Sequence, residues 1–582
     1  MCGIAGFCNF QEDFLQDAEM WKQVLVRMRT TIAHRGNDQT GEYLQHNVGL
    51  SHTRLSIRDL SGGAQPMLRK RGDWDYGIVY NGEIYNAEEL KQDLIRRGCR
   101  FETTCDTEVI LYGYMEYGME VAKKLNGIFA FAIWDAKRNA LFLCRDRLGV
   151  KPLFYAIKGD TLVFGSEPKA LFAHPKIQPQ ADLDSFREIF GLGPARTPGC
   201  GVFHGLREVK PGCILEYSPE KTKEFPYWSL EAKPHTDNYA QTVETVSWLL
   251  RDAVKRQLVS DVPVCSFLSG GIDSSVVTTI ASQQLQSKGL TLNTFSFDFT
   301  HNDTSFQPNA FQPTRERPYV DQVLALYPLH HTYLECDEAT LADMLKDAVR
   351  MKDLPGMTDV DASLLYFCGL VKQHNKVALT GECADEIFGG YPWFYREDLL
   401  HTDGFPWSAD FSARTALLSD EAIHELNLEE YARQKYLDSL ALVPTLPGEG
   451  EEARRRREMS FLNLRWFMQT LLDRMDRTSM AWGLEARVPF ADHRIVEYVY
   501  NVPWSMKYAD GMEKKLLRDA CRDLLPPELL YRKKSPYPKP YSPVYEALLT
   551  ERFQRVLADP HAPVQRFLDR KKAERFLSQP KD

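Results

Sequence analysis

The sequence predicts two domains of different fold class. Its 582 residues exceed what one hydrophobic core usually supports. Strand-like segments recur in residues 1–217, whereas strands alternate with helices in residues 239–582, and this alternation predicts an α/β domain with a parallel sheet. Residues 218–238 are rich in Lys, Glu, Pro and polar residues without a clear period, so we expect a linker there.

Composition and charge exclude several classes of protein. A content of 43% hydrophobic and 26% charged residues is typical of a globular protein. The net charge of −9, without a basic half, argues against a nucleic-acid partner, and the run 454–457 is flanked by glutamates, which predicts a solvated helix face. No apolar run is long enough for a membrane helix, and residues 1–25 lack the apolar core of a signal peptide, so we expect a cytoplasmic protein without a membrane partner. The 12 cysteines include no Cys-x-x-Cys pair, which argues against a zinc site.

The amino terminus, Met1-Cys2-Gly3-Ile4, carries the first candidate nucleophile. A residue as small as cysteine at position two permits removal of Met1, which would leave a free α-amino group beside the thiol of Cys2. An amine with a pKa near ~8 is partly neutral at cellular pH and acts as a base, directly or through a water. A cysteine after the initiator methionine usually has no catalytic meaning, so the neighbouring motifs decide.

Three further segments of the first domain have a structural and a catalytic interpretation. Residues 50–60 alternate apolar and polar side chains, as a half-buried strand does. Residues 76–85 contain two strand fragments joined at Asn81-Gly82, which is either a hairpin turn or an oxyanion hole. Asp106 either caps the helix that follows it or binds a substrate ammonium group.

Together these motifs resemble the class II glutamine amidotransferases, which have an N-terminal nucleophile. The likeness rests on Met-Cys-Gly-Ile-Ala-Gly-Phe at 1–7, Arg-Leu-Ser-Ile at 54–57, Tyr-Asn-Gly-Glu-Ile-Tyr at 80–85, and Asp106. It implies an α+β fold, a four-layer antiparallel sandwich, in which Cys2 attacks the side-chain amide of glutamine and Asn81 and Gly82 stabilise the oxyanion. The implied glutamine-binding residues are Arg54, for the α-carboxylate, Leu55, Ser56, Ile57, Arg58, Asn81, Gly82, and Glu83 and Asp106, for the α-amino group.

In the second domain, a short apolar strand at 261–268 breaks at two glycines and continues into a helical pattern. Unpaired N–H groups and the helix dipole at such a junction favour phosphate binding. The sequence Ser-Gly-Gly-Ile-Asp-Ser-Ser at 269–275 adds hydroxyl donors, and Asp273 supplies a carboxylate for Mg²⁺. A Gly-rich turn with a polar helix cap is the structural alternative. The stretch resembles the pyrophosphate loop of ATP pyrophosphatases, and it is not a Walker A loop because no Gly-Lys-Ser/Thr follows.

Other segments of this domain are expected near that loop. Strands are predicted at 290–297 and 377–379, and ligands bind at the carboxyl ends of parallel strands, so the acids of residues 380–386 are expected to bind metal or position substrate. Solvated turn acids are the alternative. Residues 472–490 combine helical spacing with many Arg and Asp, which predicts a helix with surface ion pairs. Residues 511–518 begin an amphipathic helix whose lysines are expected to be exposed unless one reaches a phosphate.

The glutaminase-like segments are followed by four motifs of the second domain. Taken in order, all of these segments resemble the glutamine-hydrolysing asparagine synthetases, and the resemblance covers nearly the whole chain. The four motifs are the 269–275 loop, Thr-Gly-Glu-Cys-Ala-Asp-Glu-Ile-Phe-Gly-Gly-Tyr at 380–391, Gly-Leu-Glu-Ala-Arg-Val-Pro-Phe at 483–490 and Met-Glu-Lys at 512–514. The resemblance implies the substrates glutamine and aspartate and the cofactors ATP and Mg²⁺, with Glu382 supporting formation of the acyl-adenylate and Asp273 and Asp385 holding Mg²⁺. The implied ATP-binding residues are Leu268, Ser269, Gly270, Gly271, Asp273, Ser274, Ser275, Phe297, Thr380, Gly381 and Lys514.

The implied products are asparagine, glutamate, AMP and pyrophosphate, formed through β-aspartyl-AMP. A carboxylate oxygen is a poor leaving group, so adenylation must precede attack by ammonia. Ammonia released into bulk water would become inert ammonium, and this predicts a water-excluding passage between the domains.

The acceptor is less well determined by the sequence. Residues 531–541 resemble the tail of a subgroup in which some members amidate cell-wall meso-diaminopimelate, so that acceptor is the alternative to aspartate. A non-catalytic scaffold would be expected to have lost Cys2 or Asp273, and both are present. Family members are often homodimers, so a homodimer is one expectation. Residues 301–318 are expected to form a long surface loop whose role the sequence does not indicate.

Overall fold

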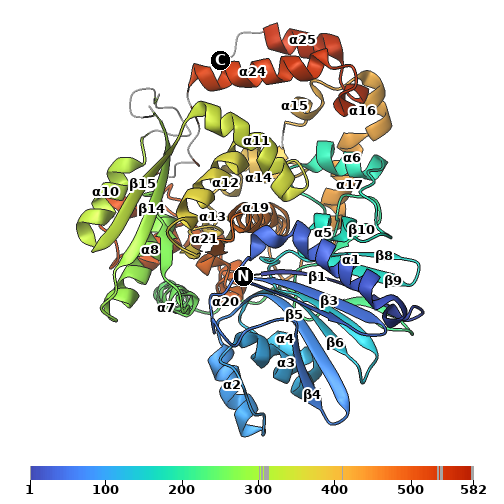
Figure 1. Ribbon diagram of the computed structural model, residues 1–582. Coiled ribbons are helices and arrows are strands. Elements are labelled where there is room, and N and C mark those ends of the chain that lie inside the picture. Colours follow the sequence, from blue (N-terminus) through green and yellow to red (C-terminus); the bar gives the residue numbers. More distant parts are fainter. Residues whose placement is uncertain are drawn as a thin grey trace.

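The computed structural model describes residues 2–578, apart from 301, 303–305, 307–313, 409, 534–536, 538, 539 and 541. Figure 1 shows an N-terminal region of long twisted strands, blue to cyan, beside a C-terminal region in which a smaller sheet is surrounded by helices. The last helices, α24 and α25, lie far from the blue strands.

Two six-stranded antiparallel sheets form the N-terminal domain. Their strand orders are β10-β8-β9-β1-β3-β2 and β12-β11-β7-β6-β5-β4. The strands are β1 (Cys2–Asn9), β2 (Gln39–Leu44), β3 (Val48–Arg54), β4 (Met67–Arg71), β5 (Trp74–Ile84), β6 (Gly127–Asp135), β7 (Ala140–Arg145), β8 (Phe154–Lys158), β9 (Thr161–Gly165), β10 (Leu206–Glu208), β11 (Cys213–Tyr217) and β12 (Thr222–Pro226). The helices are α1 (Ala18–Thr31), α2 (Ala87–Arg96), α3 (Asp106–Tyr117), α4 (Val121–Lys124), α5 (Pro168–Phe172) and α6 (Leu183–Arg187).

Alternation of side chains along the strands produces four layers. In β6, Phe129, Phe131 and Ile133 pack with α2 and α3, whereas Ala130 and Ala132 pack with residues of the first sheet. Helices α1 and α5 cover the outer face of the first sheet. Large side chains therefore fill the space under the helices, and small ones let the two sheets approach. The predicted four-layer sandwich is confirmed.

Two local predictions in this region were wrong, and part of a third segment forms a strand. The strand expected over 50–60 ends at Arg54, and β3 is buried at every position because sheets and helices cover both of its faces. Asn81 and Gly82 form no turn, since β5 continues through them and pairs with β6. The segment expected to be a linker begins with the edge strand β12, which pairs with β11. Its polar residues follow from its place at the edge of the sheet.

The C-terminal domain is built on a five-stranded parallel sheet, as predicted. Its order is β15-β14-β13-β16-β17, with all neighbours parallel. The strands are β13 (Val264–Phe267), β14 (Leu292–Phe299), β15 (Leu329–Cys336), β16 (Val377–Leu379) and β17 (Glu485–Arg487). The main helices are α7 (Tyr239–Gln257), α8 (Ile272–Gln286), α10 (Arg317–Leu326), α11 (Glu338–Lys352), α12 (Asp359–Lys372), α13 (Ala384–Phe388), α18 (Glu451–Leu462), α19 (Met468–Met480), α20 (His493–Asn501) and α22 (Lys515–Ala520).

Shorter or outer helices complete this domain. They are α14 (Glu397–Leu400), α15 (Ser412–Thr415), α16 (Asp420–Leu426), α17 (Leu428–Leu440), α21 (Trp504–Lys507), α23 (Pro527–Leu530), α24 (Pro543–Ala558) and α25 (Arg570–Ser578). Among the described residues, no helix is both long and apolar enough to cross a membrane.

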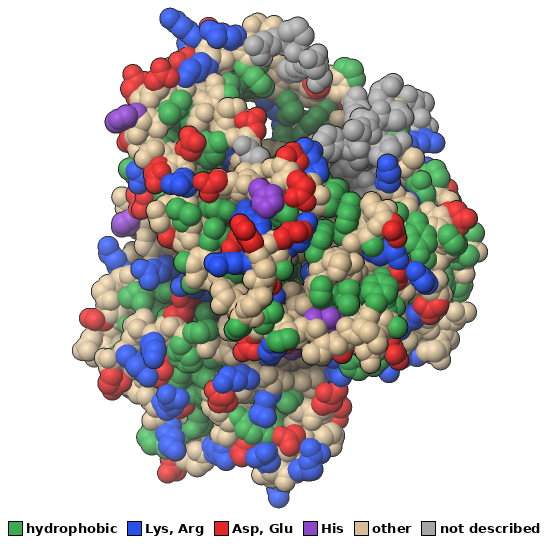
Figure 2. Space-filling model, turned by 180° about the vertical axis from the view of Figure 1, so that it is seen from behind, with side chains coloured by type: hydrophobic (Ala, Val, Ile, Leu, Met, Phe, Trp, Pro, Cys, Tyr) green, Lys and Arg blue, Asp and Glu red, His purple; other side chains and the backbone are tan. Residues whose placement is uncertain are grey.

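Charged side chains are mixed over the surface seen in Figure 2, where blue and red groups alternate without a large patch of one sign. The run 454–457 lies on α18, and only Arg454 is mostly exposed. Arg455 donates to the carbonyl oxygen of Leu400 at 2.8 Å, and Arg457 pairs with Glu449 at 2.8 Å. The solvated face expected there was therefore wrong for three of the four arginines, which anchor neighbouring segments instead.

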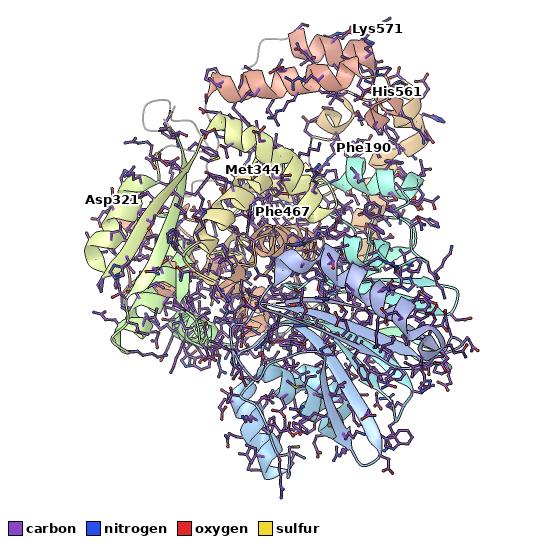
Figure 3. The ribbon with its side chains drawn as sticks, viewed as in Figure 1. Phe190, Asp321, Met344, Phe467, His561 and Lys571 are labelled. Carbon is purple, nitrogen blue, oxygen red and sulfur yellow. The ribbon has the colours of Figure 1, made fainter. Side chains whose placement is uncertain are left out.

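The two domains share one hydrophobic cluster. It joins Leu55, Ile57 and Ile128 of the sandwich to Val246 of α7, Leu472 of α19 and other residues of the second domain. Figure 3 shows α19 at the centre of the molecule, with Phe467 labelled just before it. This helix lies between the sandwich and the parallel sheet, so it contacts both functional regions.

Candidate active sites

Cys2 begins β1, in the middle of the first sheet, and is almost fully buried. Its backbone N donates to Oδ1 of Asn81 at 2.9 Å, and its carbonyl accepts from Nε of Arg35 at 3.1 Å. Burial raises the pKa of the Cys2 thiol, and a hydrogen bond from the Leu55 backbone opposes this. Met1, whose removal the sequence predicts, lies outside the described residues. The predicted nucleophile is thus held by groups from three separate segments.

Asn81 and Gly82 come from β5, in the second sheet. Asn81 is fully buried, and its Nδ2 has no hydrogen-bond partner among the described atoms. A Cβ on Gly82 would lie 2.2 Å from the carbonyl oxygen of Ile128, so only glycine permits the close approach of β6. The structure therefore brings the predicted oxyanion residues together beside Cys2, in a strand rather than a turn.

The predicted amino-group ligands, Glu83 and Asp106, are both buried. Asp106 accepts from the Tyr80 hydroxyl at 2.8 Å and from the Ile84 backbone N at 2.9 Å. Glu83 accepts from Arg58 at 3.0 Å. Burial and the Asp106 charge raise the pKa of Glu83 to about 8, despite nearby arginines. Asp106 is the first residue of α3, not its N-cap.

Arg54 organises the loop that follows β3. Its guanidinium donates to Oε1 of Gln39 at 2.6 Å, to the carbonyl of Arg58 at 3.1 Å, and to the carbonyls of Asp59 and Leu60. The other predicted pocket residues lie along this loop, and Ser56 is held by a bond from its N–H to Asp38 at 2.7 Å. In this structure Arg54 positions the loop, and its predicted contact with a glutamine carboxylate stays a prediction.

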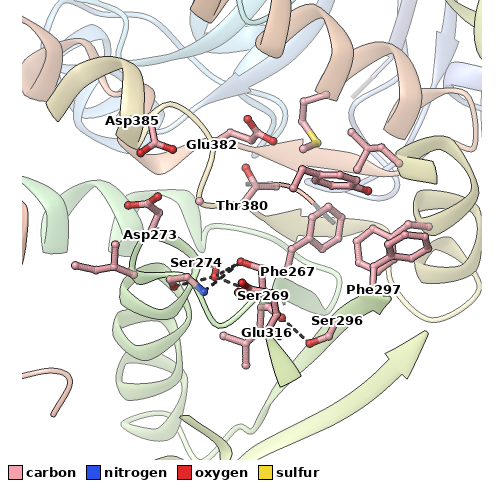
Figure 4. A pocket seen from close by; sticks show the side chains of 18 of the residues that line it. Phe267, Ser269, Asp273, Ser274, Ser296, Phe297, Glu316, Thr380, Glu382 and Asp385 are labelled. Atoms are coloured by element: carbon pink, nitrogen blue, oxygen red, sulfur yellow. Dashed lines mark hydrogen bonds between the residues drawn. The ribbon is translucent and has the colours of Figure 1, made fainter. Parts of the chain in front are cut away.

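A cavity of about 450 Å³ lies at the carboxyl ends of the parallel strands. Figure 4 shows Ser269, Asp273 and Ser274 on one side of it and Thr380, Glu382 and Asp385 on the other. Leu268, Phe297 and Gly381 line the same cavity, whereas Gly270 and Ser275 are not among its lining residues. The sequence thus located this site, because strand ends, a glycine-rich loop and clustered acids are local signals.

The 269–275 loop is closed by its own hydroxyl groups. Oγ of Ser274 accepts from the N–H of Ser269 at 3.1 Å and lies 3.0 Å from Oγ of Ser269. Gly270 has φ +76°, which favours glycine. Gly381, at the end of β16, abuts the first turn of α8, since a Cβ there would lie 2.6 Å from the N of Ser274. The backbone of the two segments is in direct contact.

Lys514 stands between the two predicted metal ligands. Its Nζ lies 2.8 Å from Oδ2 of Asp273 and 2.8 Å from Oδ1 of Asp385. The lysine is buried, not exposed, and occupies the left-handed position before α22. Burial alone would lower the pKa of Lys514, but the two carboxylates outweigh it and raise that pKa. Carboxylate oxygens are ligands that Mg²⁺ prefers, and within the described residues these two are not joined by a third acidic, His or Cys ligand.

The sequence did not identify several cavity residues. Arg474 of α19 pairs with Glu382 at 2.8 Å, and Arg532 pairs with Glu316 at 2.7 Å. Tyr537 also lines the cavity, within the tail whose role was not predicted. Most of the 301–318 loop, and residues 534–536, 538, 539 and 541 of that tail, lie outside the described residues.

The ion pairs predicted on the surface of residues 472–490 are buried between the domains. Asp476 of α19 lies 2.8 Å from Arg35 and 2.9 Å from Lys151, and all three side chains are inaccessible to solvent. Arg477 pairs with Glu167 of the sandwich at 3.2 Å. Residues 485–487 form the strand β17, not helix. The prediction was wrong because sequence gives the charges but not their distant partners.

Fold and sites define a glutamine amidotransferase joined to an ATP-dependent synthetase. Residues 1–228 match the family model described as glutamine amidotransferase domain, and residues 245–582 match the model described as asparagine synthase. The chain belongs to the family of glutamine-hydrolysing asparagine synthetases, whose members use ATP.

Three relatives indicate the range of this family. The chain is similar to asparagine synthetase [glutamine-hydrolyzing] 3 of Bacillus subtilis strain 168, with 47% identity over 579 residues that cover 99% of this chain and 93% of that protein. Asparagine synthetase [glutamine-hydrolyzing] 1 of the same organism is 31% identical, over 93% of this chain and 87% of that protein. The amidase chry2 of Gibberella zeae is 30% identical, over 93% of this chain and 89% of that protein.

Proposed function

We propose that this protein transfers the amide nitrogen of glutamine to the β-carboxyl group of aspartate, with ATP as the activating substrate. The glutaminase activity in this proposal rests on one observation. The buried Asn81 amide accepts a hydrogen bond from the Cys2 backbone N through Oδ1, and its Nδ2 has no partner among the described atoms. A donor fixed in this way suits the oxyanion that forms when the Cys2 thiol attacks the glutamine amide. Loss of Met1 would supply the α-amine as the base.

The synthetase half follows from the cavity. The loop at 269–275 offers N–H and hydroxyl donors to phosphates, and the apolar side chains of Leu268 and Phe297 suit an adenine ring. Asp273 and Asp385 would hold Mg²⁺, which neutralises charge on the phosphates. Lys514, beside Asp273 and Asp385, would stabilise the charge that develops on the phosphates. The buried Arg474, paired with Glu382, places further positive charge in the same cavity.

The contact between the domains supports transfer of ammonia without exposure to water. Leu55, next to the Cys2 thiol, belongs to the same hydrophobic cluster as Leu268 at the edge of the cavity. An apolar region excludes the protons that would convert ammonia into ammonium. Cytoplasmic location and a homodimer remain part of the proposal.

Replacing Cys2 by Ala tests the division of labour. We expect Cys2→Ala to abolish glutamine-dependent synthesis and to leave synthesis from added ammonium salts within about threefold of the unsubstituted enzyme, because the ATP site has its own residues. Pyrophosphate release with each nitrogen donor is the measurement. Equal loss of both activities would contradict two separate sites.

The acceptor needs its own test. With glutamine, ATP and Mg²⁺ present, aspartate and a diaminopimelate peptide are supplied separately and pyrophosphate is measured. Release with aspartate alone supports the proposal, and release with the peptide alone would replace aspartate by the alternative acceptor.

Asp385→Asn tests the Mg²⁺ assignment. We expect the Mg²⁺ concentration for half-maximal pyrophosphate release to rise at least about tenfold, since weaker perturbations of metal sites already cost 10- to 100-fold in affinity. Asp403→Asn, at an exposed acid, is the matched control. An unchanged Mg²⁺ requirement in Asp385→Asn would remove this residue from the metal site.

A further inference from the structure

Arg532, which lines the cavity, contacts the 269–275 loop from a segment that the sequence did not connect with it. Its Nη1 donates to the carbonyl oxygen of Gly270 at 2.7 Å. The same guanidinium forms a fork with Glu316, at 3.0 Å and 2.7 Å, and lies 3.8 Å from the ring centre of Tyr319. The side chain is about 5% exposed. A charged donor therefore holds one particular carbonyl of the loop.

The orientation of that carbonyl matters because it shares a peptide unit with the N–H of Gly271. In a trans peptide the C=O and the following N–H point in opposite directions. Because the Gly270 carbonyl points to Arg532, the N–H of Gly271 points the other way, toward Oγ of Ser269 at 3.4 Å. Gly271, Ser269 and Arg532 all line the cavity. A flip of this peptide would aim a carbonyl oxygen, instead of a donor, at a bound phosphate.

Glycine at both positions makes such a flip easy, because neither residue has a side chain that restricts φ. Neighbouring residues restrict the flip of this peptide instead. A Cβ on Gly270 would lie 3.0 Å from the Glu316 carbonyl oxygen and 3.0 Å from Cβ of Tyr319, so the start of α10 packs directly on the loop. Arg532 joins these parts by bonding to both Gly270 and Glu316.

The segment around Arg532 is itself tied to the lysine of the site. Arg518, on α22, donates to the carbonyl of Arg532 at 3.1 Å and to that of Leu530. Its Nε donates to the carbonyl of Glu513 at 2.7 Å, next to Lys514. One helix thus anchors both the lysine that contacts Asp273 and the arginine that contacts Gly270.

From these contacts we infer that Arg532 is a positioning residue for nucleotide binding, which orients the Gly270–Gly271 peptide so that its N–H faces the phosphates of ATP. The inference rests on the proposed function, in which ATP binds this loop. It assigns to residue 532 a role in nucleotide affinity, not in glutamine hydrolysis.

The test compares Arg532→Met with the unsubstituted enzyme by aspartate-dependent exchange of labelled pyrophosphate into ATP. We expect KM for ATP to rise about tenfold or more, the loss typical of a hydrogen bond to a charged group. At saturating ATP the rate should stay within about threefold, and KM for glutamine in the glutaminase assay should not change. Arg532→Lys, which keeps one donor but loses the fork, should give a smaller rise.

Two further variants separate positioning from folding. Glu316→Gln leaves Arg532 in place but weakens its support, so we expect KM for ATP to rise two- to fivefold. Arg522→Ala is the matched control, since its side chain is 61% exposed and its partners among the described residues are Asp519 and Tyr531, not the loop. That variant should match the unsubstituted enzyme in all assays.

The outcomes distinguish the positioning role of Arg532 from the proposed function on which it rests. If the unsubstituted enzyme shows no ATP-dependent exchange with any acceptor, the proposed function fails. If it does, and folded Arg532→Met and Arg532→Lys both keep KM for ATP within twofold, the positioning role is wrong. A parallel loss of glutaminase and exchange in every Arg532 and Glu316 variant would also overturn it, in favour of a structural role.

Discussion

At the scale of single residues, the orientation of the Asn81 amide follows from its partner. Oδ1 accepts from the Cys2 N at 2.9 Å, and exchange of the two amide ends would place an NH₂ group against that donor. Nδ2 is therefore the end without a partner, inside the protein. Leaving a buried donor unpaired costs about 1–3 kcal/mol, which is reasonable where a substrate oxyanion completes the bond.

Asn81→Ala should lower kcat for glutamine hydrolysis about 10²- to 10³-fold, the usual effect of removing one oxyanion donor. Synthesis from added ammonium salts should remain, because the nucleotide cavity is separate. The measurement is glutamate release beside ammonia-dependent pyrophosphate release. As a matched control, Asn9→Ala removes a buried amide at the end of β1, the strand of Cys2. This amide contacts Thr161 at 2.7 Å, and its loss should leave kcat within about threefold. Near-normal hydrolysis by Asn81→Ala would exclude the oxyanion role.

Residues with local motifs could be predicted from the sequence, and residues defined by distant partners could not. Cys2, Asn81 and Asp273 occur in compact motifs, and the structure brings Cys2 and Asn81 together although they are 79 positions apart. Arg532 contacts Gly270 across 262 positions and has no periodic neighbour that would reveal this. For Lys514 the residues alone favoured exposure, and only the family resemblance implied a role at ATP, because amphipathic spacing does not distinguish a solvent face from a face that lines a cavity.

At the scale of elements, strand prediction depended on burial and length. β13, β14 and β16 were found from apolar runs. β15 was missed because its histidines and glutamate lie on an edge strand, and β17 because three residues are too few for a period. The fold class was nevertheless predictable, since the α/β alternation requires only that most strands be recognised.

The contact between β16 and α8 gives a prediction at this scale. A methyl group on Gly381 would lie 2.6 Å from N of Ser274 and 2.9 Å from the backbone carbon of Asp273, so Gly381→Ala must push the first turn of α8 away. We expect ATP-dependent exchange to fall more than tenfold while glutamine hydrolysis is retained.

Gly450→Ala is the control for this change, since an added methyl group there meets no atom within 4 Å. It should leave both activities nearly unchanged. Normal KM for ATP in Gly381→Ala would show that the phosphate loop does not depend on the position of this strand end.

At the scale of the whole molecule, buried charges join the two domains. Asp476 on α19 bonds to Arg35 and Lys151 of the sandwich, and Arg35 in turn donates to the carbonyl of Cys2. Arg474, two residues earlier on the same helix, reaches Glu382 in the nucleotide cavity. Such pairs are little screened by salt and depend on exact geometry. The helix thus places each active site relative to the other.

Asp476→Asn should destabilise the protein by about 3–5 kcal/mol, because two buried cations would lose their carboxylate partner. Asp523→Asn breaks an exposed pair with Arg251 and should cost less than about 1 kcal/mol. Thermal unfolding of both variants, followed at pH 7.5, is the comparison. We also expect Asp476→Asn to release more glutamate per asparagine formed, since the domains would be held less rigidly.

The pH dependence of this contact has a definite sign. Burial alone would raise the pKa of Asp476, but Arg35 and Lys151 outweigh it and lower that pKa, and Arg487 likewise lowers the pKa of Glu485 to about 2. A carboxyl group whose pKa is lower in the folded state stabilises that state above its ordinary pKa, near ~4, and loses this contribution as pH falls through the folded value. Stability should therefore fall as pH decreases from about 5 toward 2, and Asp476→Asn should weaken this dependence. An identical acid dependence in Asp476→Asn would show that this carboxylate is not charged in the folded protein.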